Sequence, residues 1–547
     1  MNIPNTQYAV QLVGPDQVVL NPDKPVLRPG PYQVLAKTEA VGLCFSDMKL
    51  LKQFSGHVRK TEAISGDAMG ILNEIPSYVP GDKPTVPGHE VTVRVVAVGN
   101  KVKHYRVGQR WIVQADYRNL KTAGANCALG YDFEGGLQEY VLMDERVIGD
   151  PDGPEGYMIA ADEENSASAL ALVEPWACVE RAYATKERRS LKAGGRLLVV
   201  VDPGRQVGSF EAIIEGSNFA EVVRFSPQTA DREPLTEIPA AHFDDIVYFG
   251  HDPETVEALD AKLAPNGVLN VVLGGKKLGR PVSLAVGRAH YGNMRWIGTT
   301  GDDPAESYRM VPETGELRAG DRLLVIGAGG PMGQMHVIRA LSSGTPGLQV
   351  TASDIDDTRL RVLSEKVAPL PASTGDGFRT VNTTKEDPGS GFSYAALMAP
   401  VPALVTDGLR RCAPGARLNV FAGIPATVRH PIDMDDVIAK RIYILGTSGS
   451  EIEDMKVVYR KLADGRLDTD LSVGAISGMA GAQEGLKAVE NRTMDGKIVV
   501  YPELHDLGLI PLEQLAERLP SVAALLHNGA WSKEAEAELM RTCQSGS

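Results

Sequence analysis

The pattern of hydrophobic and polar residues changes along the chain. Up to about residue 150, short runs rich in β-branched residues are separated by Gly and Pro, as in YQVLAKTEAVGLC, VTVRVVAVG and LQEYVLM. Such runs predict an antiparallel, barrel-like β domain. From about residue 165 the pattern becomes helical, and from residue 196 apolar strands alternate with helical stretches. This alternation is typical of parallel sheets, so the chain is predicted to be an α/β protein.

The second half of the chain contains a repeat. LKAGGRLLVVVDPGRQVG (191–208) matches LRAGDRLLVIGAGGPMG (317–333), and LAPNGVLNVVLGG (263–275) matches CAPGARLNVFAGI (412–424). IGTTG (297–301) also matches LGTSG (445–449). Because the matches keep the same order, they predict two tandem Rossmann-type domains. The alternative is that any two parallel-sheet domains share strands that end in Gly.

A glycine-rich loop follows the first strand of the second copy. It consists of Gly327, Gly329, Gly330, Pro331, Met332 and Gly333 with one Ala. Glycines there allow a tight turn and let the backbone and a helix N-terminus approach a pyrophosphate. The next strand ends at Asp354, whose carboxylate can bind ribose hydroxyls and repel a 2′-phosphate, which favours NAD over NADP. The alternative is that Asp354 caps the following helix. Further predicted cofactor contacts are Arg359, Gly423 and Thr447.

The first copy departs from this pattern. Its loop carries Asp202 and Pro203 where N–H groups would meet phosphate, and Ser226 stands at the position of Asp354. A carboxylate beside a pyrophosphate is unfavourable by a few kcal/mol in a partly dry site. The first copy is therefore predicted to be degenerate, with the fold retained and the cofactor lost, although Arg205 and Arg224 leave room for another anion.

These patterns predict four parts. Residues 1–185, completed by 455–503, form the β-rich domain; 186–310 form the degenerate Rossmann-like domain; 311–454 form the NAD-binding Rossmann domain; and 504–547 form a helical tail.

Composition narrows the class of ligand. A net charge of −14 argues against nucleic acid or an anionic membrane as a partner, so small molecules are expected. The five cysteines form no CxxC pair, and no signal peptide or apolar run of membrane length is visible. A soluble, cytoplasmic protein is expected.

Several ordered motifs resemble those of one family. The segments VGLCFSD (41–47), PGHE (87–90), VGQR (107–110), GGLQEYV (135–141), LVEP (172–175) and GKIVVYP near the end are similar to those of zinc-dependent medium-chain alcohol/polyol dehydrogenases. The resemblance covers roughly residues 30–185 and 315–505. It implies a GroES-like fold for the β-rich domain. The first α/β copy, inserted between the two regions, is a departure from the usual two-domain layout.

The resemblance implies a catalytic zinc site. Cys44 and His89 match zinc ligands, and Glu90 or Glu174 would complete the set. Ser46 would relay a proton, and Asp47 would orient His89. A thiolate, an imidazole and a carboxylate also suit Zn²⁺ chemically. Each residue taken alone also has a purely structural interpretation. Cys44 could be a buried thiol and His89 a core histidine, Glu90 and Glu174 could be ion-paired carboxylates, and Ser46 and Asp47 could cap the next helix.

A second zinc is not expected, because the loop that holds four cysteines in the family offers only Cys127 here. The long insert at 51–84 is predicted to cover the substrate pocket. Five basic residues lie in this insert or just before it: Lys49, Lys52, His57, Arg59 and Lys60. They are interpreted either as contacts to an anionic group of the substrate or as a solvated basic face.

The implied activity is hydride transfer between NAD and a secondary alcohol or ketone of a sugar, polyol or sugar phosphate, by a homo-oligomer. One alternative is an enzyme that retains NAD and oxidises a sugar transiently for elimination or epimerisation. A second alternative is a non-enzymatic sensor or scaffold.

Overall fold

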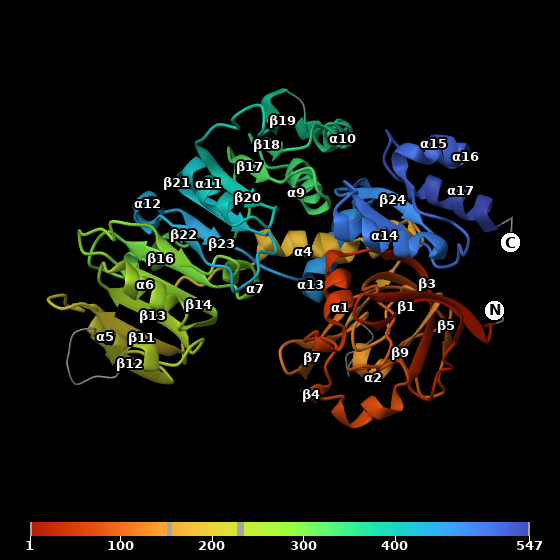
Figure 1. Cartoon of the computed structure of the whole chain (residues 1–547), viewed down its shortest axis with the longest axis horizontal. Helices are drawn as coiled ribbons and strands as arrows, with labels where there is room; N and C mark the ends of the chain where they lie inside the picture. The colour runs from red at the N-terminus through yellow and green to blue at the C-terminus, as the bar shows by residue number, and fades with distance from the viewer. Residues whose placement is uncertain (1–2, 150–155, 227–234, 374, 545–547) are drawn as a thin grey trace. The chain divides into compact units, whose positions relative to one another are not determined.

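The computed structural model describes residues 3–149, 156–226, 235–373 and 375–544. The chain divides into two compact units (Figure 1). Unit 1 contains residues 1–180 and 450–547, and unit 2 contains residues 181–449. Among the described residues, no helix is both long and apolar enough to cross a membrane.

Unit 1 is built around an eight-stranded sheet in the order β10-β6-β5-β3-β25-β24-β26, with β9 also paired to β3. Its pairs are antiparallel except for β24 with β25. The strands are β3 (Gln33–Gly42), β5 (Glu90–Val98), β6 (Arg110–Val113), β9 (Tyr140–Asp144), β10 (Met158–Ala161), β24 (Val473–Ser477), β25 (Lys497–Val500) and β26 (Ile510–Pro511). The valine-rich strand β5 is central and largely buried, which suits its β-branched composition.

Two smaller antiparallel sheets complete the β structure of unit 1. One is the hairpin of β1 (Thr6–Gly14) and β2 (Gln17–Pro25). The other joins β4 (Ala63–Gly66), β7 (Asp116–Thr122) and β8 (Asn126–Ala128). Strand β4 comes from the insert at 51–84, so part of this insert is held as an edge strand.

The helices of unit 1 are short. They are α1 (Phe45–Gln53), α2 (Glu145–Ile148), α3 (Ala167–Ala171), α13 (Ile452–Ala463), α14 (Met479–Asn491), α15 (Leu515–Arg518), α16 (Pro520–Ala523) and α17 (Lys533–Gln544). Helix α4 (Val173–Ala184) runs from unit 1 into unit 2. The C-terminal segment contacts α3, because the carboxylate of Glu536 on α17 accepts hydrogen bonds from the N–H groups of Ala167 and Ser168.

Unit 2 contains two parallel sheets. The first has the order β12-β11-β13-β14-β16. Its strands are β11 (Arg196–Val201), β12 (Glu221–Phe225), β13 (Phe243–Phe249), β14 (Leu263–Val272) and β16 (Arg295–Thr299). The accompanying helices are α5 (Phe210–Glu215), α6 (Pro253–Asp260), α7 (Arg288–Tyr291) and α8 (Ala305–Met310).

The second sheet has the order β19-β18-β17-β20-β21-β23. Its strands are β17 (Arg322–Ile326), β18 (Gln349–Asp354), β19 (Phe378–Asn382), β20 (Phe392–Leu397), β21 (Cys412–Val420) and β23 (Tyr443–Leu445). Its helices are α9 (Pro331–Ser342), α10 (Asp357–Val367), α11 (Ala403–Arg411) and α12 (Met434–Lys440), and Figure 1 shows α9 and α10 beside β17 and β18. In chain order this is 3-2-1-4-5-6, the order of a dinucleotide-binding sheet.

The two sheets correspond strand by strand, except that no strand lies outside β12 in the described part of the first copy. They are connected by β15 (Val282–Leu284) and β22 (His430–Ile432), which pair with each other. The predicted α/β class, with a β-rich part and two Rossmann-type parallel sheets, is confirmed. The predicted four-part division stays a prediction.

Candidate active site

The start of helix α1 brings Cys44, Ser46 and Asp47 together. Cys44 is the N-cap residue, and its backbone N–H donates to Asp47 Oδ2 over 3.0 Å. The other oxygen of Asp47 lies 3.1 Å from His89 Nδ1. Ser46 Oγ donates to Cys44 Sγ over 2.9 Å and lies 3.2 Å from His89 Nε2. Asp47 therefore caps the helix and holds the histidine at the same time, so the two interpretations of this residue are compatible.

The pairing of β3 with β5 explains why His89 lies near Cys44. Strand β5 begins at Glu90, and Glu90 lies opposite Gly42, the last residue of β3. Helix α1 follows β3 directly, so the start of one strand meets the start of the helix. Gly42 leaves the space for the carboxylate, because a Cβ there would lie 2.0 Å from Glu90 Oε2.

Cys44, His89 and Glu90 offer one ligand atom each, and these atoms lie within 4.8 Å of one another. His89 and Glu90 are buried. Although burial by itself lowers the pKa of His89, the adjacent Asp47 carboxylate raises it well above the usual value. A metal would displace that proton and bind the neutral ring. Sulfur, nitrogen and oxygen donors at this spacing fit Zn²⁺.

A buried lysine beside this group was not identified from the sequence. Lys497 Nζ donates to Glu90 Oε1 over 2.6 Å and to the carbonyl of Leu43 over 2.7 Å. Burial lowers the pKa of Lys497, but Glu90 and Cys44 raise it above the usual value in sum. Glu90 Oε2 is buried without a hydrogen-bond partner among the described residues, which suits a metal-binding oxygen. The signal for Lys497 was a lysine directly before the buried run IVV.

Glu174 lies in the first turn of α4, outside the group of three described above. Burial raises the pKa of Glu174, and His89, Glu90 and Lys497 all interact with it electrostatically. Cys178, one helical turn later, donates its S–H to Glu174 Oε1 over 3.7 Å. Glu174 is therefore a buried neighbour of the site, and its role as a ligand stays a prediction.

An aromatic ring lies beside His89. The Tyr131 ring centroid is 5.7 Å from that of His89 and 5.2 Å from that of His57. The guanidinium carbon of Arg59 lies 5.8 Å from the centre of the Tyr131 ring. Sequence reasoning missed Tyr131, because nothing in the segment LGYDF distinguishes this tyrosine from a core residue. Tyr131, His57 and Arg59 thus form the wall beside His89.

The basic residues of the insert differ in exposure: Lys52 is exposed, whereas His57 and Lys60 are buried. Arg59 pairs with Asp116 over 2.7 Å. Lys60 is fully buried and donates to the carbonyls of Val79 and Lys83. Burial, with a smaller effect of Arg59, lowers the pKa of His57 to about 4, so this ring is neutral at pH 7. The interpretation as a solvated face is wrong for Arg59 and Lys60, because the fold uses their charges internally.

The glycine-rich loop of the second copy has the shape that a dinucleotide requires. Gly327 has φ = +82°, and a Cβ on Gly333 would lie 2.3 Å from the Gly327 carbonyl oxygen. By contrast, no atom lies within 4 Å of a Cβ built on Gly330, the N-cap residue of α9. Pro331 and Met332 form the first turn of this twelve-residue helix. The loop is therefore packed on one side and open at the helix N-terminus, and helix N-termini commonly bind phosphate groups in proteins.

Asp354 is the last residue of β18. Its Oδ2 accepts from the Gly329 N–H over 2.8 Å, and its Oδ1 accepts from the Ile355 N–H over 2.8 Å. Asp356, not Asp354, is the N-cap of α10. The carboxylate therefore stands at the carboxyl edge of the sheet, next to the loop.

The other predicted cofactor contacts lie at strand ends or beside the loop. Arg359 packs its Cβ toward Gly329 and pairs with Asp356 over 3.9 Å. Gly423 follows β21, and Thr447 follows β23. Thr447 Oγ1 is buried without a hydrogen-bond partner among the described residues. The cofactor roles of these residues stay predictions.

The corresponding loop of the first copy is filled by its own side chains. Asp202 Oδ2 accepts from Tyr248 Oη over 2.8 Å. Arg205 donates to the Leu273 carbonyl over 2.7 Å, at the carboxyl end of β14, and pairs with Asp302 over 3.1 Å. Arg224, the second arginine considered for an anion, pairs with Glu211. Both arginines are therefore already neutralised by carboxylates.

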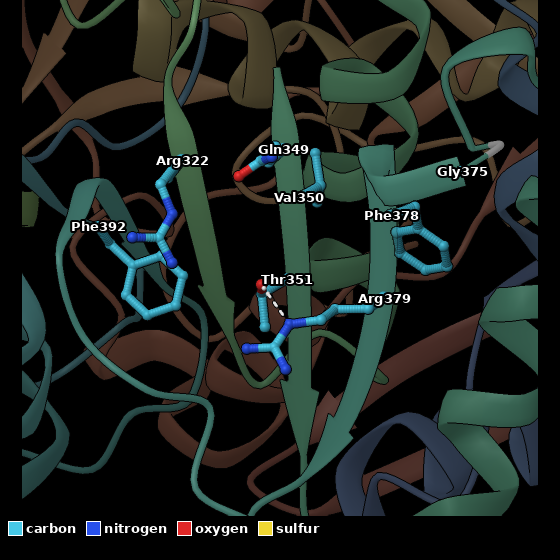
Figure 2. Close-up of a pocket in the computed structure, with 8 residues that line it drawn as sticks. All are labelled: Arg322, Gln349, Val350, Thr351, Gly375, Phe378, Arg379 and Phe392. Atoms are coloured by element: carbon cyan, nitrogen blue, oxygen red, sulfur yellow. Dashed lines mark hydrogen bonds between the residues drawn. The ribbon is translucent and has the colours of Figure 1, made fainter. Parts of the chain in front are cut away.

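Figure 2 shows a surface pocket of about 250 Å³ at the opposite edge of the second sheet. Arg322 lies over the Phe392 ring, 5.3 Å from its centroid, and Arg379 Nε donates to Thr351 Oγ1 over 3.2 Å. The remaining lining residues are Gln349, Val350, Gly375 and Phe378. Because these residues mark the amino ends of β17, β18, β19 and β20, the pocket is distinct from the carboxyl edge, where nucleotides bind.

Parts of the chain are similar in sequence to known proteins. Residues 30–150 match the alcohol dehydrogenase GroES-like domain. The chain is 27% identical over 245 residues to the uncharacterized protein YggP of Escherichia coli (strain K12), covering 41% of this chain and 57% of that protein. It is 29% identical over 236 residues to L-sorbose 1-phosphate reductase of Klebsiella pneumoniae, covering 41% of this chain and 56% of that enzyme. The chain thus spans little more than half the length of these curated relatives.

Among solved structures, 2R,3R-butanediol dehydrogenase from Bacillus subtilis aligns with a TM-score of 0.51 and 16% identity, covering 91% of this chain and 100% of that one. At this identity the likeness concerns the fold. Together with the domain match, it confirms the predicted resemblance to medium-chain alcohol/polyol dehydrogenases and the GroES-like fold of the β-rich part.

Proposed function

We propose that the protein is a zinc-dependent, NAD-linked oxidoreductase that transfers a hydride between nicotinamide and a secondary alcohol or ketone of a sugar or polyol. The observation that carries this proposal is the convergence of Cys44, His89 and Glu90, with Asp47 behind the histidine. A scaffold would have no need for such a buried donor set. The names of the relatives, a sorbose phosphate reductase and butanediol dehydrogenases, support the same reaction class.

Cys44, His89 and Glu90 would hold the zinc ion, with Glu174 as an exchangeable fourth donor. When bound, zinc supplies a Lewis acid that lowers the pKa of a substrate hydroxyl, and NAD supplies the hydride acceptor. Asp47 fixes the His89 ring through Nδ1, which leaves Nε2 as the donor atom. Lys497 neutralises the buried Glu90 carboxylate and keeps its Oε1 in place.

Ser46 is the residue that would take the substrate proton. Its Oγ lies within hydrogen-bonding distance of both Cys44 Sγ and His89 Nε2, so it is adjacent to two of the three donor atoms. A hydroxyl there can accept a proton from the substrate oxygen and pass its own proton onward. Asp354 and the open N-terminus of α9 would bind the ribose and pyrophosphate of NAD.

The wall beside His89 favours a neutral polyol over a phosphorylated sugar. Arg59 is paired with Asp116, Lys60 is fully buried, and His57 is neutral at pH 7. These residues offer hydrogen-bond donors and an aromatic surface rather than a net positive charge. Such a surface suits hydroxyl groups better than a phosphate dianion.

The test combines metal analysis with a screen of NADH formation over polyols, aldoses and their phosphates. The purified chain should contain one zinc ion and reduce NAD with a polyol. Cys44→Ser should lose both zinc and activity, whereas Cys543→Ser, a matched change on α17, should keep both. A Cys44→Ser protein that retains zinc and turnover would contradict the proposal. Turnover without net NADH formation would favour transient oxidation by a retained cofactor.

A further inference from the structure

The two α/β copies pair with each other at equivalent positions. Strand β15 of the first copy is antiparallel to β22 of the second, with Ser283 opposite Pro431. The offset of 148 residues that matches Gly298 to Gly446 also matches Ser283 to Pro431. The flanking pairs, Val282 with Ile432 and Leu284 with His430, are symmetric about this centre. A strand pair centred on equivalent residues is the signature of a local two-fold axis.

Two glycines repeat this reciprocity. A Cβ on Gly298 of the first copy would lie 2.6 Å from Ile438 Cδ1, on helix α12 of the second. A Cβ on its counterpart Gly446 would lie 2.9 Å from the Ala289 carbonyl oxygen, on helix α7 of the first. Helices α7 and α12 occupy the same place in the repeat. Each copy therefore places the same helix against the last strand of the other.

A further pair of contacts follows the same symmetry. The Asp435 carboxylate accepts from the N–H groups of Leu278 and Gly279 in the first copy, each over 2.9 Å. The counterpart of Asp435 is Gly287, and a Cβ there would lie 2.2 Å from the Ile424 carbonyl oxygen in the second copy. Side chains of both copies share one hydrophobic core, including Leu284 and Trp296 from the first copy and Ile432 and Ile438 from the second. The contact is isologous and apolar, as in a symmetric dimer.

The contact between the two copies places the side chain of Tyr291, from the first copy, beside the predicted cofactor site of the second copy. Tyr291, at the end of α7, has its Oη 2.9 Å from the position of a Cβ on Gly423. The Tyr291 side chain is partly exposed, at 41%. Arg295 donates to the Gly446 carbonyl over 3.1 Å, directly before Thr447. Gly423 and Thr447 are the two predicted cofactor contacts at this end of the sheet.

The contact that the second copy makes with the corresponding site of the first copy has no tyrosine. The counterpart of Tyr291 in the second copy is Ala439, which has no polar side chain. The counterpart of Gly423 is Gly274, and a Cβ there would lie 1.9 Å from Arg205 Nη1. The backbone arrangement is therefore symmetric, while the side chain beside the glycine differs: Tyr291 of the other copy lies beside Gly423, and Arg205 of the same copy lies beside Gly274.

We propose that the first copy is a built-in second subunit, which forms an internal pseudo-two-fold dimer with the second copy and supplies Tyr291 to its cofactor site. The Tyr291 phenol would hydrogen-bond a polar group at the nicotinamide end of NAD(H). This inference rests on the proposed function, because it requires a dinucleotide on the second copy. It gives the degenerate copy a role that needs no cofactor of its own.

Calorimetric titration of the full chain with NADH tests the binding role. One NADH should bind per chain, and Tyr291→Phe should weaken binding about fivefold, the effect of one hydrogen bond, with an unchanged melting temperature. Ile213→Ala, at an exposed position of α5 in the same copy, should leave binding unchanged. Failure of the unmodified chain to bind NADH would overturn the proposed function. One NADH per chain with equal affinity in Tyr291→Phe, or two NADH per chain, would overturn the inference alone.

A disulfide tests the internal pairing. In Ser283→Cys/Pro431→Cys the two thiols face each other across an antiparallel pair, a spacing that a disulfide can bridge. Oxidation should give one new disulfide within a single chain, seen by mass spectrometry and as a monomer band on a non-reducing gel. Either covalent dimers or two free thiols after oxidation would contradict the internal dimer.

Discussion

The two α/β copies have the same fold, but the loop after the first strand is open in the second copy and filled by side chains in the first. In the second copy the loop before α9 is open at Gly330, and Asp354 holds the adjacent turn. In the first copy Arg205 fills the carboxyl edge of the sheet and binds backbone carbonyls there. The hydrophobic strands needed for the sheet are kept in both, since burial depends only on apolar character. A few loop residues therefore separate a loop that is open at the helix N-terminus from one that is filled by its own side chains.

The largest effect is expected from placing a carboxylate at the open N-terminus of α9 in the second copy. Gly330→Asp should weaken NADH binding about 100-fold or more, because a negative charge would face the pyrophosphate at the helix N-terminus. The side chain has room at this position, so folding should be unaffected. Fluorescence titration with NADH measures the change. Asp202→Gly, in the loop of the first copy, should create no new binding. Equal NADH affinity in Gly330→Asp would contradict the site.

Acid stability sharpens the comparison at the helix that follows each loop. Helix α9 carries the buried His336, where the first copy has the partly exposed Glu211. Burial, with a smaller effect of Arg339, lowers the pKa of His336 to about 3. Below about pH 6.5 the unfolded chain binds a proton there that the folded chain does not, so stability falls as pH drops toward 3.

His336→Gln isolates this effect. At pH 5 the unmodified protein should lose about 2 kcal/mol at this site relative to pH 7, and the variant should be spared this loss. Tyr183 Oη lies 2.8 Å from His336 Nδ1, and the Gln amide offers both a donor and an acceptor to this hydroxyl. Urea unfolding between pH 4 and 7 measures both proteins. Parallel profiles would show that His336 does not set the acid sensitivity.

Exchange of the strand-end residue should have a smaller effect. Asp354→Asn removes the charge near the ribose, so NADH affinity should fall about tenfold while NADPH affinity rises. The register of β12 on β11 places Ser226 at the same position in the first copy. Ser226→Asp is the matched control and should gain no binding. Unchanged preference between NADH and NADPH in Asp354→Asn would show that Asp354 does not select the cofactor.

The smallest effect should come from the arginine that fills the first copy. Arg205→Met removes hydrogen bonds to the carbonyls of Leu273 and Val272, which should reduce the free energy of unfolding by about 1 kcal/mol. NADH affinity should not change, because the cofactor is proposed to bind the second copy. Trp296, buried in the first copy, reports unfolding by fluorescence. A second NADH site in Arg205→Met would show that the arginine alone blocks binding.

The fold was predictable because its periodicities are local. Apolar strands that end in Gly, separated by helical segments, indicated both parallel sheets, and the repeat fixed their correspondence. The sequence did not predict that, among the described residues, β12 would be the outermost strand of its sheet. Only 17 residues separate β12 from β13. The hydrophobic pattern of these residues does not show whether a strand pairs with β12 on its outer side.

The residues of the candidate site could be predicted where they belong to a recognisable sequence motif. Cys44, His89 and Glu90 are distant in sequence but each lies in a recognisable segment, and the pairing of β3 with β5 brings them together. Lys497, Tyr131 and Tyr291 were missed, because a lysine or tyrosine between apolar residues is typical of many buried positions. Of the two interpretations of the basic residues, the solvated face is wrong for Arg59 and Lys60, because Arg59 pairs with Asp116 and Lys60 donates to backbone carbonyls inside the fold.

The sequence by itself determined which segments become strands, where the glycine loop turns and which donors could bind a metal. These properties depend on side-chain type and on neighbours a few residues away. The tertiary structure decided the charge of His57, the ion pair of Glu90 with Lys497 and the contact of Tyr291 with Gly423. Each of these depends on desolvation or on a partner brought close only by packing, and neither quantity is defined until the chain has folded.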